Sequence, residues 1–144
     1  MPRFVLLYHK CPPGYERPFH WDLMLEANGT LRTWALARLP RDWRAIQHRT
    51  ADADPNCPPI ASDNSVGAEQ LPDHRLDYLH QEGPLSNNRG HVSRIDAGTY
   101  VTETEAAARW EIHLTGGELC GKIALRQHSP GSAQWMLTLK ESKV

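Results

Sequence analysis

Three side chains near the amino-terminal end of the chain have the types and spacing of a metal site. In the segment HWDLMLE (20–26), the two-residue period of a β-strand sends His20 and Asp22 to the same face. With a rise of about 3.3 Å per residue, their backbones lie about 7 Å apart, so the imidazole and the carboxylate can converge on one cation. His9 ends the preceding apolar segment and would supply a third ligand if the two segments pair.

Other interpretations of this spacing stay open. His20 and Asp22 could simply lie on a solvated strand face and bind nothing. Two histidines and one carboxylate are also the ligand set of non-haem iron oxygenases, and spacing alone does not separate oxygenation from hydrolysis.

A second cluster, DHRLDY (73–78), places His74 and Tyr78 four residues apart. One helical turn or a compact loop would bring both side chains to the same place. His74 could then donate a proton to a leaving oxygen or stabilise charge on a phosphate, while Tyr78 could hydrogen-bond a phosphate oxygen. The structural alternative is that Tyr78 anchors the loop in the core and His74 caps it.

The segments around these residues alternate between apolar and polar side chains, which indicates β-strands. Residues 20–27 and 31–36 flank Asn28-Gly29, a dipeptide typical of a tight hairpin turn. Further strands are expected at 4–9, 91–95, 99–103, 109–114, 119–126 and 134–139. Their turns are expected at Ala97-Gly98, Gly116-Gly117 and Ser129-Pro130-Gly131. The fold is therefore expected to be mainly β, as a compact antiparallel barrel or a sandwich of seven or eight strands.

Two stretches depart from this alternation. Residues 41–48 have the pattern of a short helix. Residues 49–72 are rich in Asp, Asn, Pro, Ser and Gly with few large apolar groups, which is typical of a long mobile loop.

Length and composition narrow the class of protein. A chain of 144 residues fits a single domain over 1–144. No apolar stretch has membrane-spanning length and the first residues turn polar too soon for a signal peptide, so we expect a cytoplasmic protein without membrane contact. Three cysteines without a close pair indicate reduced thiols. A net charge of -1 disfavours wrapping long duplex DNA but permits a small site for one strand end.

Together these pieces resemble the 3'-phosphoesterase domain family of bacterial DNA ligase D. The resemblance spans residues 4–140 in order, with gaps. It rests on the segments FVLLYH (4–9), HWDLMLE (20–26), GTLRTWAL (29–36), DHRLDY (73–78), EG (82–83), DAGTY (96–100), LCGKIAL (119–125) and WML (135–137).

The resemblance implies a compact β-barrel with a divalent metal, usually manganese and with zinc as an alternative. Its two histidines and aspartate match His9, His20 and Asp22, and the histidine and tyrosine beside the scissile phosphate match His74 and Tyr78. Members remove a 3'-terminal ribonucleoside and then a 3'-phosphate from DNA ends during end joining. This chain would be a stand-alone member that acts on DNA 3' ends beside separate ligase and polymerase repair proteins.

The chain departs from the family pattern at several positions. The loop between His9 and His20 is longer than usual. Met24 replaces an arginine, Leu7 a glutamine and Val66 a further arginine. Losing one charge-assisted phosphate contact costs about 1.5–3 kcal/mol, so we expect the activity of this chain to be weakened.

Three arginines on neighbouring strands are candidates to replace the lost phosphate contacts. They are Arg32, Arg38 and Arg94, and Arg38 stands where a lysine is usual. Guanidinium groups suit bidentate phosphate contacts, although the same residues could be solvated surface arginines.

The leading expectation is a metal-dependent phosphoesterase that trims phosphate or ribonucleotide from DNA 3' ends. The alternative is a catalytically weak or inactive module that binds a nucleic-acid end or a phosphate, because Leu7, Met24 and Val66 replace polar groups. An iron oxygenase fits the ligand types but not the surrounding segments.

Overall fold

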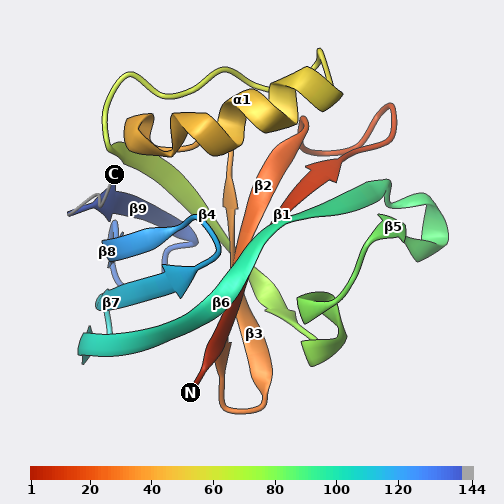
Figure 1. Ribbon diagram of the computed structural model, residues 1–144. Coiled ribbons are helices and arrows are strands. Elements are labelled where there is room, and N and C mark those ends of the chain that lie inside the picture. The colour runs from red at the N-terminus through yellow and green to blue at the C-terminus, as the bar shows by residue number, and fades with distance from the viewer. Residues whose placement is uncertain (141–144) are drawn as a thin grey trace.

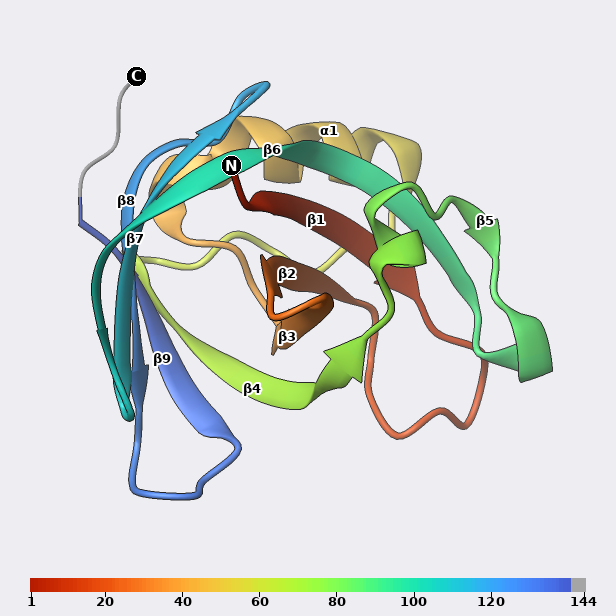
Figure 2. The same cartoon turned by 90° about the horizontal axis from the view of Figure 1, so that it is seen from below.

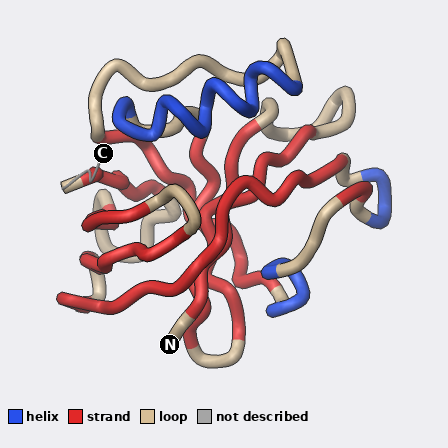
Figure 3. The backbone as a smooth tube through the Cα atoms, viewed as in Figure 1, coloured by secondary structure: helices blue, strands red, loops and turns tan. Residues whose placement is uncertain are grey.

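The protein is built mainly from antiparallel strands (Figures 1 and 3). The structure is a computed structural model and describes residues 1–140. The strands are β1 (Arg3–Lys10), β2 (His20–Ala27), β3 (Thr30–Leu36), β4 (Ser65–His74), β5 (Gly83–Pro84), β6 (His91–Ala106), β7 (Arg109–Gly116), β8 (Cys120–Gln127) and β9 (Gln134–Leu139). The helical elements are η1 (Arg41–Trp43), α1 (Arg44–Ala53), η2 (Leu76–Leu79) and η3 (Ser86–Asn88). No helix within residues 1–140 is long and apolar enough to cross a membrane.

Eight of the strands close into a barrel. They follow the order β1-β2-β3-β4-β9-β8-β7-β6, and β6 pairs back onto β1, while the short β5 adds to the edge of β6. Figure 2 shows β6 to β9 and β4 curving around β1, β2 and β3, with α1 lying across one end. The mainly β fold and the antiparallel barrel that the sequence predicts are confirmed.

The hairpin between β2 and β3 forms where the sequence predicts it. Asn28 and Gly29 both have positive φ, 53° and 79°, as the favoured two-residue hairpin turn requires. This turn fixes the register, so that Asp22 lies opposite Ala35 and Leu23 opposite Trp34.

Strands β1 and β2 are buried on both faces, and this is what encloses the candidate site. One face carries Phe4, Leu6 and Tyr8 of β1 and joins the main core inside the barrel. The other face carries Val5 and Leu7, which pack with Met24 of β2, Tyr78 of η2 and further apolar residues in a second, smaller cluster. Polar groups on this second face therefore lie under a cover rather than in bulk water.

Strand β6 corrects the prediction of two strands separated by a turn at Ala97-Gly98. Its 16 residues run without interruption through Gly98. The first part pairs with β1 and the second with β7, so one strand closes the barrel. Gly98 is needed for close approach and not for a turn, because a Cβ there would overlap the Thr115 carbonyl oxygen.

The predicted loop over 49–72 is also shorter than expected. Residues 49–53 belong to α1 and residues 65–72 to β4. Strand β4 escaped prediction because only Val66 and Ala68 are buried, so its alternation is short. Residues 54–64 remain a connection, but backbone hydrogen bonds from Ala61 to Leu39 and from Arg41 to Asp63 tie it to the barrel. Mobility of this connection stays a prediction.

Candidate active site

Strands β1 and β2 bring His9, His20 and Asp22 together on the covered face of the barrel. His9 lies directly opposite His20 in the β1–β2 register. The exposed fractions are 7% for His9, 3% for His20 and 4% for Asp22. His20 Nε2 lies 3.1 Å from Asp22 Oδ1, and His9 Nδ1 lies 3.6 Å from Asp22 Oδ2. The long loop between the two histidines is thus an excursion that returns the chain to the same place.

Backbone carbonyls orient both imidazoles. His20 Nδ1 lies 2.9 Å from the Pro18 carbonyl oxygen, and His9 Nε2 lies 2.7 Å from the Arg89 carbonyl oxygen. Since a carbonyl only accepts, these two nitrogens are assigned the protons. The other nitrogens, His20 Nε2 and His9 Nδ1, then turn their lone pairs towards Asp22. Metal-bound histidines are commonly held in this way, with the outer N–H on a backbone carbonyl.

Two buried atoms at the centre of the site have no hydrogen-bond partner among the described residues. They are His20 Nε2 and Asp22 Oδ1, whose 3.1 Å approach is an ion-pair contact without hydrogen-bond geometry. Burial alone would lower the pKa of His20, but its contact with Asp22 raises the pKa on balance. Burial likewise favours a higher pKa for Asp22, yet His20 and His9 bring it down to about 2. The carboxylate is therefore ionised, and the site favours a positive charge beside it.

Cys11 is a neighbour that the sequence did not single out. His9, Cys11 and His20 place one donor atom each within 4.8 Å of one another. The Cys11 sulfur lies 3.7 Å from His20 Nδ1, the nitrogen that faces Pro18, and 3.5 Å from the Pro18 carbonyl oxygen. Burial, followed by the charge of Asp22, raises the pKa of the thiol to about 11. Asp22 therefore fits better than Cys11 as the third donor, because it faces the free nitrogens of both histidines.

The second predicted pair, His74 and Tyr78, lies across a small cavity from these residues. The cavity has a volume of about 60 Å³, and His9, His20, Asp22, His74 and Tyr78 all line it. The rings of His74 and Tyr78 meet edge to face, with centroids 4.9 Å apart. His74 Nδ1 lies 3.0 Å from the Pro72 carbonyl oxygen, and burial lowers the pKa of His74. An N–H on Nδ1 leaves Nε2 free for a ligand.

The arginines suggested from the sequence are not gathered at this cavity. Arg32 lies on the barrel side that carries the main core, with its guanidinium 5.1 Å from the Trp34 ring centroid and 4.8 Å from that of Trp110. Arg94 lines other hollows, beside Glu82 and beside Tyr8. Arg38 lines a larger neighbouring groove. Arg32 and Arg94 therefore lie away from the small cavity in which a phosphate would bind.

Two other arginines, Arg17 and Arg89, do line the small cavity. Arg17 belongs to the long loop and binds both carboxylate oxygens of Glu69, at 3.2 and 3.0 Å. Its position three residues before His20 is the feature of the sequence that could have identified Arg17 as a neighbour of the site. Arg89 follows η3, and nothing local to its sequence marks it.

The three departures from the family pattern lie in apolar surroundings. Leu7 and Met24 are buried together in the smaller apolar cluster beside the cavity. Val66 belongs to the main core. The wall of the cavity nearest Asp22 is thus apolar where the resemblance implies polar groups.

These features define the class: a closed β-barrel with a buried histidine–carboxylate centre beside a histidine and a tyrosine. A family model described as the DNA Ligase D 3'-phosphoesterase domain matches residues 14–127. This is more than half of the chain, and the protein belongs to that family. His20, Asp22, His74 and Tyr78 lie inside the matched range, and His9 precedes it. A comparison with curated proteins gave no match.

Proposed function

We propose that the protein is a metal-dependent phosphoesterase that removes a phosphate or a ribonucleotide from the 3' ends of DNA. The observation that carries the proposal is the pair of buried, unpartnered atoms, His20 Nε2 and Asp22 Oδ1, which face each other beside a cavity. Leaving such atoms without a partner costs about 1–3 kcal/mol each, and a bound cation would offset that cost. Membership of the 3'-phosphoesterase family supports the same function.

His9 Nδ1, His20 Nε2 and Asp22 would hold the divalent metal. Neutral imidazoles with a carboxylate suit manganese, zinc or iron better than calcium, and manganese is the first choice. When bound, the metal supplies a Lewis acid that polarises a phosphate oxygen and offsets developing charge.

The remaining side chains act on the substrate from the other side of the cavity. His74 stays largely neutral at pH 7 because burial lowers its pKa, so its free Nε2 can accept a proton or a hydrogen bond as the substrate enters. The Tyr78 hydroxyl can donate to a non-bridging phosphate oxygen. Leu7 and Met24 exclude water from the opposite wall, which strengthens the electrostatic contacts inside.

The test is the conversion of a labelled primer-template that ends in a 3'-phosphate. With manganese, the strand should gain a 3'-hydroxyl, resolved on a denaturing gel, and a second strand ending in one ribonucleotide should be shortened. His20→Ala should abolish both reactions. His113→Ala, which removes a histidine on β7 away from the site, is the matched control and should retain them.

A second candidate, a module that binds DNA ends without turnover, is favoured by the apolar wall of Leu7 and Met24. The two functions separate in one experiment. If the wild-type protein binds the labelled end only with manganese but releases no phosphate and no nucleotide, the binding module replaces the phosphoesterase. In either case we propose that the partners are DNA 3' ends in the cytoplasm, handed to separate ligase or polymerase proteins.

A further inference from the structure

The face of the barrel that carries the candidate metal centre continues sideways across three more strands. The registers align Asp22 of β2 with Ala35 of β3, Glu69 of β4 and Gln134 of β9 in one row. Directly opposite residues in antiparallel strands point to the same face. The row therefore leads from the metal centre along the outside of β3, β4 and β9.

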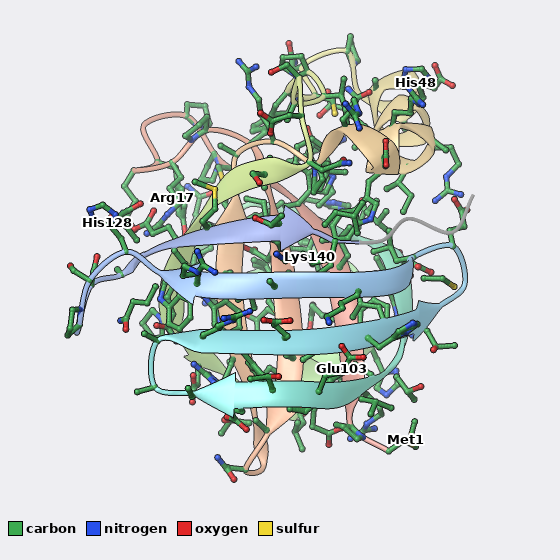
Figure 4. All side chains as sticks on the ribbon, turned by 90° about the vertical axis from the view of Figure 1, so that its left-hand side faces the viewer. Met1, Arg17, His48, Glu103, His128 and Lys140 are labelled. Atoms are coloured by element: carbon green, nitrogen blue, oxygen red, sulfur yellow. The ribbon has the colours of Figure 1, made fainter. Side chains whose placement is uncertain are left out.

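A groove of about 520 Å³ follows this row. It shares Arg17 and His20 with the small cavity, so the two hollows are neighbours. Small residues form much of its lining, among them Ala35, Ala37 and Gly67. The loop before β2 borders the groove on the side of Arg17, which Figure 4 labels, and residues 61–63 border it elsewhere. The volume lies within the range of about 300–1,000 Å³ that is typical of small-molecule sites.

The charged side chains that line the groove are balanced in number, with two arginines and two carboxylates. Glu69 is neutralised by Arg17, and Asp63 accepts the backbone N–H of Ser65 at 2.8 Å. Arg38 is exposed, and none of the ion pairs among residues 1–140 includes it. A weakly charged groove suits an uncharged group, while the guanidinium of Arg38 suits an anion.

We propose that this groove holds the terminal nucleoside of the DNA strand whose 3'-phosphate lies at the His9–His20–Asp22 centre. The inference rests on the proposed function and adds how its substrate is held. The flat, small-residue lining lets a sugar and a base approach closely, and Arg38 meets the next phosphate of the strand. Since no Phe, Tyr or Trp among the described residues lines the groove, the contact with the base is mainly apolar and should discriminate little among bases.

The variant Gly67→Trp tests the groove without touching the metal ligands. A Cβ at Gly67 meets no atom within 4 Å, and its φ is not in the left-handed region, so the new side chain is accommodated and occupies the groove. Val101→Trp is the matched control, because Val101 is 50% exposed on β6 and lines none of the hollows described above. Figure 4 shows Glu103, two residues further along β6, on the part of the barrel away from Arg17.

The measurement is a competition in the presence of manganese. A fluorescein-labelled single strand with a 3'-phosphate is displaced by thymidine 3'-monophosphate or by inorganic phosphate and followed by anisotropy. Wild type and Val101→Trp should prefer the nucleotide over inorganic phosphate at least tenfold, and Gly67→Trp should reduce that preference to less than threefold. Arg38→Ala should weaken binding of the labelled strand but leave the affinity for thymidine 3'-monophosphate unchanged.

Manganese affinity, measured by titration calorimetry, should be the same in all four proteins. A preference that survives in Gly67→Trp, or that wild type itself lacks, overturns the inference. Loss of manganese affinity in Gly67→Trp also counts against it, because the groove would then be part of the metal site. These are binding measurements, so a wild-type protein that binds but never releases phosphate would refute the proposed function and leave the groove standing.

Discussion

Replacing Asp22 by asparagine is the sharpest test of the candidate metal centre. The side chains have the same shape, so a buried position with 4% exposure can accept the change without a cavity. The asparagine NH₂ can donate to His20 Nε2, which in the native protein lies 3.1 Å from Asp22 Oδ1. We therefore expect Asp22→Asn to fold, but to lose the negative charge that a metal requires.

The size of the effect follows from linkage between binding and folding. At a manganese concentration a hundredfold above its Kd, the metal stabilises the wild-type protein by about 2.7 kcal/mol. Because about 1 kcal/mol shifts Tm by roughly 2–4 °C for a chain of this size, Tm should rise by about 5–11 °C. Losing one charge-assisted contact of about 1.5–3 kcal/mol would leave about 0.3–1.3 kcal/mol, a rise of about 1–5 °C.

Thermal unfolding followed by calorimetry, with manganese and with a chelator, gives both rises directly. Asp52→Asn, an exposed carboxylate on α1, is the control for the loss of one negative charge and should behave as wild type. An equal manganese-induced rise in Asp22→Asn and wild type would refute the assignment of Asp22 to the metal.

Three further results are expected. His74→Ala should slow phosphate release from a 3'-phosphate strand by roughly 10²–10⁴-fold, while the manganese-induced rise in Tm stays as in wild type; a lost rise would place His74 at the metal instead. Met24→Arg should lower Tm and not restore activity, because Met24 is 1% exposed in an apolar cluster. The double variant Met24→Arg with Leu7→Gln should be more active in the gel assay than Met24→Arg alone. Without metal, the contact between His20 and Asp22 should stabilise the protein most between their ordinary pKa values, 3.8 and 6.5. The lowered pKa of Asp22 means that this stability is lost as pH falls towards about 2, and the raised pKa of His20 means that it is lost as pH rises through the raised pKa of this imidazole. Chemical denaturation across pH should show both losses in wild type and smaller ones in Asp22→Asn, where other carboxylates such as Glu26, whose pKa Arg3 lowers, still contribute to the acid loss.

Local chemistry explains what could be predicted from the sequence. The positive φ of Asn28 and Gly29 fixes the hairpin, and the two-residue period then puts His20 and Asp22 on one face. The spacing of His74 and Tyr78 is local as well, and a single short helical turn brings their rings together. Each of these predictions needs only residues that are close in the chain.

The features that escaped prediction depend on segments far apart in the sequence. Ala97-Gly98 has the residue types of a turn, but Gly98 is needed because the backbone of β7 approaches it closely. The sequence suggests Arg32 as a phosphate ligand, but its guanidinium lies over the ring of Trp110, which belongs to a distant strand. Arg17 lines the cavity with its guanidinium bound to Glu69 of β4, which is 52 residues away in the sequence. Sequence spacing carries no information about such partners.

The carbonyl that orients His9 belongs to Arg89, 80 residues further along the chain. Arg89 lies just before β6, the strand whose pairing with β1 closes the barrel. The proposed ligands thus lie within the first two strands, β1 and β2, but their proton arrangement is completed only when the ring of strands is closed. A nascent chain would carry His9, His20 and Asp22 long before it could present them correctly. Since pairing over such a separation is slow to form, tight metal uptake should report barrel closure during folding, and not the earlier pairing of β1 with β2.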